Sequence, residues 1–135
     1  MGEPRPSHPV GLVYDSGALI GADPGDRRIW AIHTRALQRG VRPIVPAGCV
    51  VDAWHDQRQA KLARLLDGCE IEPLTDDRAK RSGLLRAAAS GKVIAVDATV
   101  VEAAIRRVAA IATSDRAEIE NLLSNTRSKP QLIDV

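Results

Sequence analysis

The sequence predicts an α/β protein: a three-layer α/β/α sandwich built around a mainly parallel central sheet. Short apolar segments bounded by turn residues alternate with longer segments whose apolar residues recur at helical spacing. This alternation is typical of βαβ units, in which helices cover both faces of a parallel sheet. With 135 residues, the chain has the size of one domain.

The first half of the chain is expected to open with a flexible tail, because residues 1–10 contain three prolines and no apolar stretch of the kind found in signal peptides. A single domain should then occupy residues 11–135. The segment GLVYD predicts a buried strand that stops at Ser16-Gly17. The other elements expected in this half are a helix over Asp26–Arg39, a strand over Arg42–Pro46, and helices over about Ala47–Asp56 and Arg58–Leu66.

The second half is expected to start with an edge strand, since Pro73 cannot donate a ladder hydrogen bond. Thr75 is a suitable N-cap for the helix that follows. The remaining pattern predicts the edge strand over Cys69–Leu74, a helix over Asp76–Ala89, a loop over Gly91–Val96, a helix over Asp97–Arg107, a strand over Ala109–Thr113, a helix opened by Ser114-Asp115, and a last strand over Gln131–Val135.

Composition excludes several functional classes. No apolar stretch is long enough to span a membrane, so we expect a cytoplasmic protein. Cys49 and Cys69 lack metal-ligand spacing and are expected to be buried thiols. With no Phe, one Tyr and two Trp, the chain lacks the aromatic residues on which nucleic-acid bases stack.

The net charge of +2 does not by itself indicate a nucleic-acid-binding protein. Arginines gather in two segments, which is more typical of solvated helix faces than of a phosphate-binding track. They are Arg27, Arg28, Arg35, Arg39 and Arg42 in one segment, and Arg106, Arg107 and Arg116 in the other.

Four aspartates are candidate site residues. In parallel α/β sheets, ligands bind outside the carboxyl ends of the strands. Asp15 closes the first predicted strand, and Asp115 follows the strand that ends at Thr113. Asp97 begins a helix above its core-facing stripe, and Asp52 lies about one and a half turns into the helix after the second strand. We therefore expect all four acids to converge on one cavity.

Each aspartate also has a purely structural interpretation. Asp15 could shape a turn, Asp97 could be an N-cap, Asp52 could be a solvated helix residue, and Asp115 with Glu118 matches a capping box. Taken singly, these interpretations are favoured. Taken together they weaken, because acids gathered at one sheet edge repel one another without a cation. Oxygen ligands without His or Cys favour Mg²⁺ or Mn²⁺, which activates water and stabilises a phosphoryl group under attack.

Residues near the four acids are given more ordinary roles. Ser16 and Thr113 are equally consistent with a hydrogen bond to a metal ligand and with a local turn. His33 lies on an apolar stripe and is expected in the core. Glu102 is five residues beyond Asp97, faces elsewhere on the helix, and is expected to be solvated.

Four segments together resemble PIN-domain ribonucleases of the VapC toxin type. GLVYDSGAL resembles the opening strand of that family, and VPAGCVVDAW resembles a segment that usually carries a glutamate where this chain has Asp52. VDATVVEAAIRR is similar to the helix of the third acid, here Asp97. IATSDRAEIENL is similar to the turn of the fourth acid, here Asp115. The resemblance extends from Gly11 to Val135 in the order and spacing of the family.

This resemblance implies a Mg²⁺- or Mn²⁺-dependent endoribonuclease whose catalytic and metal-binding residues are Asp15, Asp52, Asp97 and Asp115. It further implies a homodimer that cuts RNA and is held inactive by a small antitoxin protein. Two departures bear on activity. Asp52 is one methylene shorter than glutamate, and Ile94 stands where many VapC toxins carry a further acid.

Two other interpretations stay open at the level of sequence. A degenerate PIN-like domain would bind a partner protein or RNA without cutting, as the departures at Asp52 and Ile94 would allow. A receiver-like signalling domain also gathers acids at strand ends, but the lysine expected after a late strand is missing.

Overall fold

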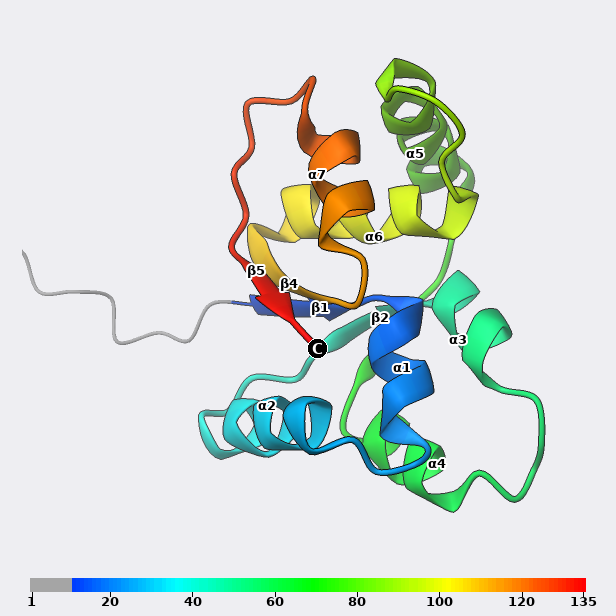
Figure 1. Ribbon diagram of the computed structural model, residues 1–135, viewed down its shortest axis with the longest axis vertical. Coiled ribbons are helices and arrows are strands. Elements are labelled where there is room, and N and C mark those ends of the chain that lie inside the picture. Colours follow the sequence, from blue (N-terminus) through cyan, green and yellow to red (C-terminus); the bar gives the residue numbers. More distant parts are fainter. Residues whose placement is uncertain (1–10) are drawn as a thin grey trace, which may run out of the picture.

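The computed structural model describes residues 11–135, and the tail expected over residues 1–10 lies outside the described part. A five-stranded parallel sheet crosses the middle of the molecule (Figure 1). Its strand order is β3-β2-β1-β4-β5. The strands are β1 (Gly11–Tyr14), β2 (Ile44–Pro46), β3 (Glu70–Glu72), β4 (Ala109–Thr113) and β5 (Leu132–Asp134).

The centre of the sheet is the pairing of β1 with β4. These strands run in register over four residue pairs, from Gly11 with Ala109 to Tyr14 with Ala112. Every residue of β4 is buried, as expected for a strand covered on both faces. The strand that precedes Pro73 lies at one edge, which confirms the prediction from that proline. This order differs from the 2-1-3-4-5 order of receiver domains, so the receiver-like interpretation is wrong.

Helices cover both faces of the sheet, which confirms the three-layer prediction (Figure 1). One layer consists of α5 (Asp76–Ala88), α6 (Ala95–Arg107) and α7 (Arg116–Leu123). The opposite layer consists of α1 (Ser16–Ala22), α2 (Arg27–Gln38) and α4 (Ala60–Asp67). A short helix, α3 (Ala47–Ala53), follows β2 directly and packs against α1.

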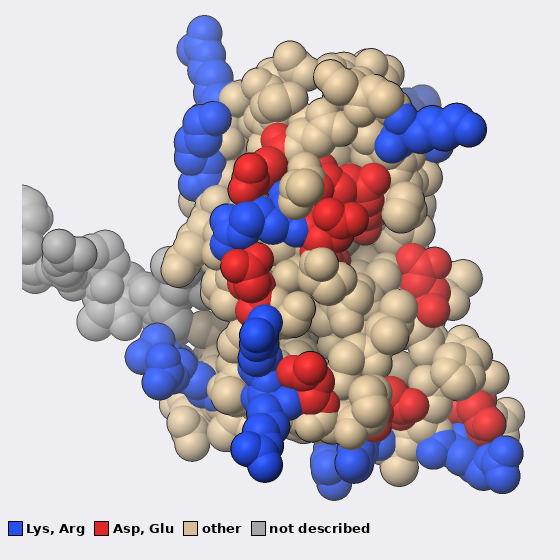
Figure 2. Space-filling model, viewed as in Figure 1, with Lys and Arg blue, Asp and Glu red and all other residues tan. Residues whose placement is uncertain are grey.

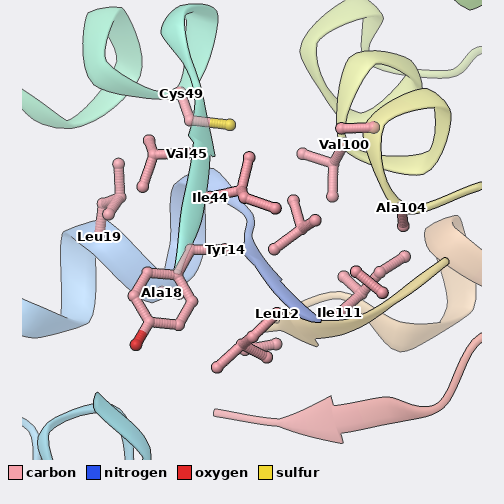
Figure 3. Close-up of a cluster of buried hydrophobic side chains, with 14 of the residues drawn as sticks. Leu12, Tyr14, Ala18, Leu19, Ile44, Val45, Cys49, Val100, Ala104 and Ile111 are labelled. Carbon is pink, nitrogen blue, oxygen red and sulfur yellow. The ribbon is translucent and has the colours of Figure 1, made fainter. Parts of the chain in front are cut away.

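The core consists mostly of aliphatic side chains from the sheet and from the helices that face it. Figure 3 shows Leu12 and Ile111 from the sheet near Val100 of α6. Tyr14 is the large aromatic residue of this core, and its hydroxyl lies 2.9 Å from Nδ1 of His33. His33 is only 3% exposed, so its predicted place in the core is confirmed.

One helix was not expected from periodicity. The segment Ser16–Ala22 forms α1 directly after β1, although it has only seven residues and two of them are glycines. Such a segment has little helical preference of its own. Its stability comes from the Asp15 side chain, which caps it, and from burial of Ala18, Leu19 and Ala22 against the sheet.

The second difference concerns α6. It begins at Ala95 instead of Asp97, with Ile94 as its N-cap residue. Asp97 is therefore the third residue of the helix, and the interpretation of Asp97 as a plain N-cap is wrong. Ile94 offers no side-chain hydrogen bond as a cap, so a capping signal is absent from the sequence at this point.

The expectation for Glu102 was also wrong. It is 5% exposed and pairs with Arg106, whose guanidinium also contacts the buried Glu72 of β3. Arg107 joins the same group through Glu70 and Glu72. The arginines at the end of α6 therefore fasten that helix to the edge strand, and their charge is used within the fold.

Candidate metal site at the carboxyl edge of the sheet

The predicted acids lie where the chain leaves the carboxyl ends of the strands. Asp15 follows β1 directly and Asp115 follows β4 after one residue, while Asp52 lies in α3 and Asp97 in the first turn of α6. Asp15 is 3% exposed and Asp97 9% exposed, whereas Asp52 and Asp115 are exposed. In Figure 2, acidic atoms gather beside α7, in the region between α6 and α7 of Figure 1.

Asp15 is held rigidly by two backbone N–H groups. Ala18 N–H donates to Oδ1 at 2.9 Å, and Ser114 N–H donates to Oδ2 at 3.0 Å. The first bond caps α1, and the second ties the end of β1 to the turn after β4. Each oxygen keeps a lone pair free for another partner. The carboxylate is thus fixed in place with capacity to bind a cation.

A close approach between α1 and the β4–α7 turn makes the second bond possible. A Cβ atom at Gly17 would lie 1.6 Å from Ser114 Oγ and 2.5 Å from Ser114 Cβ. No side chain fits in that space, so position 17 must be glycine for the two segments to meet. This contact brings the segments of Asp15 and Asp115 together.

Asp52 is joined to the site through Ser16. The Ser16 hydroxyl donates to Asp52 Oδ2 at 2.7 Å, which connects the first residue of α1 with α3. The sequence left two roles open for Ser16, and the structure shows the hydrogen bond to a candidate ligand. Thr113 takes the other role, because its Oγ1 accepts the N–H of Asp115 at 2.8 Å in a local turn.

Asp115 caps α7, as the capping-box pattern predicts. Its Oδ1 accepts the N–H of Glu118 at 3.2 Å. The return half of the box does not form, because the Glu118 side chain points to the start of α6 and accepts the N–H of Ile94 at 3.2 Å. Asp115 is therefore a cap, and its capping bond leaves Oδ2 of the exposed carboxylate for other contacts.

Asp97 has the most perturbed carboxyl of the group. Burial raises its pKa to about 8, and the neighbouring Glu118 carboxylate adds to the rise, followed by Asp15 and Asp115. The second oxygen of Glu118, Oε2, is buried and lacks a hydrogen-bond partner among residues 11–135. Like charges thus face one another around Asp97 without a compensating basic group, which is the arrangement expected of a cation site.

A buried thiol marks the floor of this region. Burial raises the pKa of Cys49 to about 12, a hydrogen bond with Ser16 opposes the rise, and the charges of Asp15, Asp97 and Asp52 add to it. These three aspartates come from three separate segments, yet all act on the same sulfur atom. Cys49 stays a neutral thiol and is an unsuitable metal ligand at neutral pH. Both cysteines are buried and free, as predicted.

The acids do not form a closed cage. Within residues 11–135, no three His, Cys, Asp or Glu side chains are close enough to surround one metal ion. Mg²⁺ seldom requires such a cage, since it keeps several waters and is bound through one or two carboxylates plus substrate phosphates. An open set of oxygen ligands, one of them buried and unpartnered, fits Mg²⁺ or Mn²⁺ and not a structural zinc ion.

The sequence did not identify Glu118 as a candidate residue. Its spacing from Asp115 is that of a capping box, which is a sufficient local explanation for a glutamate three residues after a cap. A signal was nevertheless present, because a residue three positions after Asp115 lies on the same side of α7. Only the packing of α7 beside the start of α6 shows that this carboxylate reaches Asp97.

The comparisons with known proteins bear on the fold. No protein-family model matches the sequence, and no curated protein is similar to it. Among solved structures, the chain is similar to the structure of FitAB bound to the IR36 DNA fragment, with a TM-score of 0.61 and 14% identity over 91% of this chain and 94% of the other. FitAB is a toxin–antitoxin complex in which FitB is a PIN-domain toxin.

The chain has the PIN-domain fold. At 14% identity the likeness establishes the fold, and the activity has to be argued from the chemistry of the site. None of the helices of this PIN-like domain within residues 11–135 is both long and apolar enough to cross a bilayer.

Proposed function

We propose that this PIN-like domain is a metal-dependent endoribonuclease toxin of a toxin–antitoxin pair. The observation that carries the proposal is the set of carboxylates of Asp15, Asp52, Asp97 and Asp115, which leave four segments of a PIN fold at the carboxyl edge of the sheet. Asp15 and Asp97 are nearly buried and share like charge with their neighbours, which disfavours the site unless a cation occupies it.

The residues divide the work as follows. Asp15, fixed by two N–H groups, and Asp97 would hold Mg²⁺ or Mn²⁺, with Asp115 and Asp52 contributing directly or through water. A bound ion supplies an activated water and offsets the charge on a phosphodiester under attack. Ser16 holds the shorter Asp52 side chain in place through its 2.7 Å hydrogen bond. The exposed acids leave one side of the site open to a strand of RNA.

Two partners follow from the proposed function. The FitAB complex supports a small antitoxin protein as partner of this chain. A basic side chain of that partner, such as arginine, would fit the acidic site and replace the charge of the cation. Like VapC toxins, which the sequence resembles, the chain is proposed to act as a homodimer in the cytoplasm.

A second candidate function is binding without cutting. It is favoured by the absence of three acids close enough to surround an ion within residues 11–135, and by the exposed position of Asp52. On this view, the acidic edge would bind a basic segment of a partner and the metal would play no part.

An RNA cleavage assay distinguishes these functions. The protein is incubated with single-stranded RNA in Mg²⁺, in Mn²⁺ and in excess chelator, beside Asp15→Asn and Asp97→Asn. We expect cleavage by wild type only with metal, and a loss of at least about a hundredfold in each variant, since each removes one of the few charged ligands. Folded variants that cut like wild type would refute the assignment. Wild-type protein that cuts nothing under any metal condition would favour the binding function.

A further inference from the structure

We infer that Glu118 is a fifth acid of the metal site, and that it stands in for the acid missing at position 94. This inference rests on the proposed metal-dependent function and deepens it. Glu118 lies in α7, whereas position 94 is the N-cap of α6. The substitution of one by the other therefore depends on how these two helices meet.

A stripe along α7 and its C-terminal turn clamps the segment before α6. Asn121 binds Ser90 with both ends of its amide, accepting its N–H at 3.0 Å and donating to its carbonyl at 2.8 Å. Asn125 donates to the carbonyl of Ala88. Glu118, three residues before Asn121 and on the same side, accepts the N–H of Ile94 through Oε1. The clamp fixes the position of the Glu118 carboxylate against the first turn of α6.

The same clamp leaves the other oxygen of Glu118 without a partner. Oε2 is buried and accepts no hydrogen bond from residues 11–135. A buried acceptor without a donor is costly, and a charged one more so. Its neighbour is the Asp97 carboxyl, on which Glu118 acts both through its charge and as a hydrogen-bond acceptor. Two carboxylates that face each other in this way must share either a proton or a cation.

The position of Ile94 explains why Glu118 can replace an acid there. The Ile94 side chain is 58% exposed, and its backbone N–H is the group that Glu118 binds. A carboxylate therefore already occupies the space at the start of α6 beside Asp97, although it comes from another helix. The chain thus keeps an acid at this corner of the site despite the isoleucine in its sequence.

Mn²⁺ binding to the full chain tests this role. Isothermal titration and thermal melts with Mn²⁺ are measured for wild type, Glu118→Gln and Glu120→Gln. Glutamine keeps the carbonyl oxygen that accepts the Ile94 N–H, and removes only the charge and the unpartnered oxygen. Glu120 lies on the same helix, is exposed, and forms a long ion pair with Arg116 at 3.7 Å, so it is a control for the loss of one charge.

We expect Glu118→Gln to bind Mn²⁺ at least about tenfold more weakly than wild type, with a smaller rise in Tm, while Glu120→Gln matches wild type. Without metal, Glu118→Gln should melt at or above the wild-type Tm, because the repulsion with Asp97 is gone. Should it melt lower, the titration is run where circular dichroism shows all proteins folded, and the affinity still decides. Equal Mn²⁺ affinity in Glu118→Gln and wild type would overturn the inference alone. Absence of Mn²⁺ binding to wild type would overturn the proposed function as well.

Discussion

Replacing Gly17 by alanine tests how tightly the site is assembled. The added Cβ would lie 2.5 Å from Ser114 Cβ, and rotation of the Ser114 side chain does not move that atom. One of the two backbones must therefore shift. Overpacking of this kind costs about 1–3 kcal/mol, and the helix preference of alanine over glycine offsets about 0.5–1 kcal/mol of it. We expect a net loss of about 1–2 kcal/mol, or roughly 3–8 °C in Tm for a chain of this length.

Gly21→Ala is the matched control for Gly17→Ala. It lies in the same helix, and its Cβ would meet only Asp26 Cβ at 3.6 Å, an ordinary contact. We expect it to stabilise the protein by about 0.4–1 kcal/mol. The double variant Gly17→Ala/Ser114→Gly removes both clashing atoms and should recover part of the lost Tm. Thermal denaturation followed by circular dichroism measures all four proteins. If Gly17→Ala melts like Gly21→Ala, the close approach between α1 and the β4–α7 turn is not as described.

Two further predictions concern buried charge. The raised pKa of Asp97 means that the folded protein holds this proton more tightly than the unfolded chain does, so stability without metal should fall as the pH rises from about 4 to about 8. Asp97→Asn should reduce this fall, and chelator-treated melts at pH 5 and pH 8 that show equal slopes for both proteins would contradict the assignment. Glu102→Ala leaves the partly buried Arg106 with fewer partners and should cost about 1–3 kcal/mol, whereas Asp76→Ala, which breaks an exposed pair with Lys80, should cost under about 0.5 kcal/mol in the same urea titration.

The layers and strands of the fold could be predicted from the sequence because their signals are local. β4 has the predicted bounds Ala109–Thr113, and Thr75 caps α5 as expected. The starts of α1 and α6 could not be predicted in the same way. α1 depends on a cap from the preceding strand and on burial of small residues, and α6 begins at an isoleucine that carries no capping group. In both cases tertiary packing overrides weak local preference.

The candidate site divides along the same line. Strand ends identify Asp15 and Asp115 as neighbours, because parallel strands finish at one edge of a sheet. The burial of Glu102 and the reach of Glu118 depend on which helices pack together, and spacing along one helix contains no such information. Both glutamates have ordinary local explanations, a solvated face and a capping box, and only contacts with β3 and α6 show otherwise.

The hydrogen bond from Ser114 N–H to Asp15 joins residues 99 positions apart in the chain. β1 is synthesised early, but the strand that completes its pairing follows only after most of the domain has left the ribosome. Contacts of such long sequence separation form slowly, because the intervening chain must first be ordered. A nascent chain that ends before β4 therefore cannot hold its first carboxylate in place. The acidic edge becomes functional late in folding, after the helices that precede β4 have had time to form.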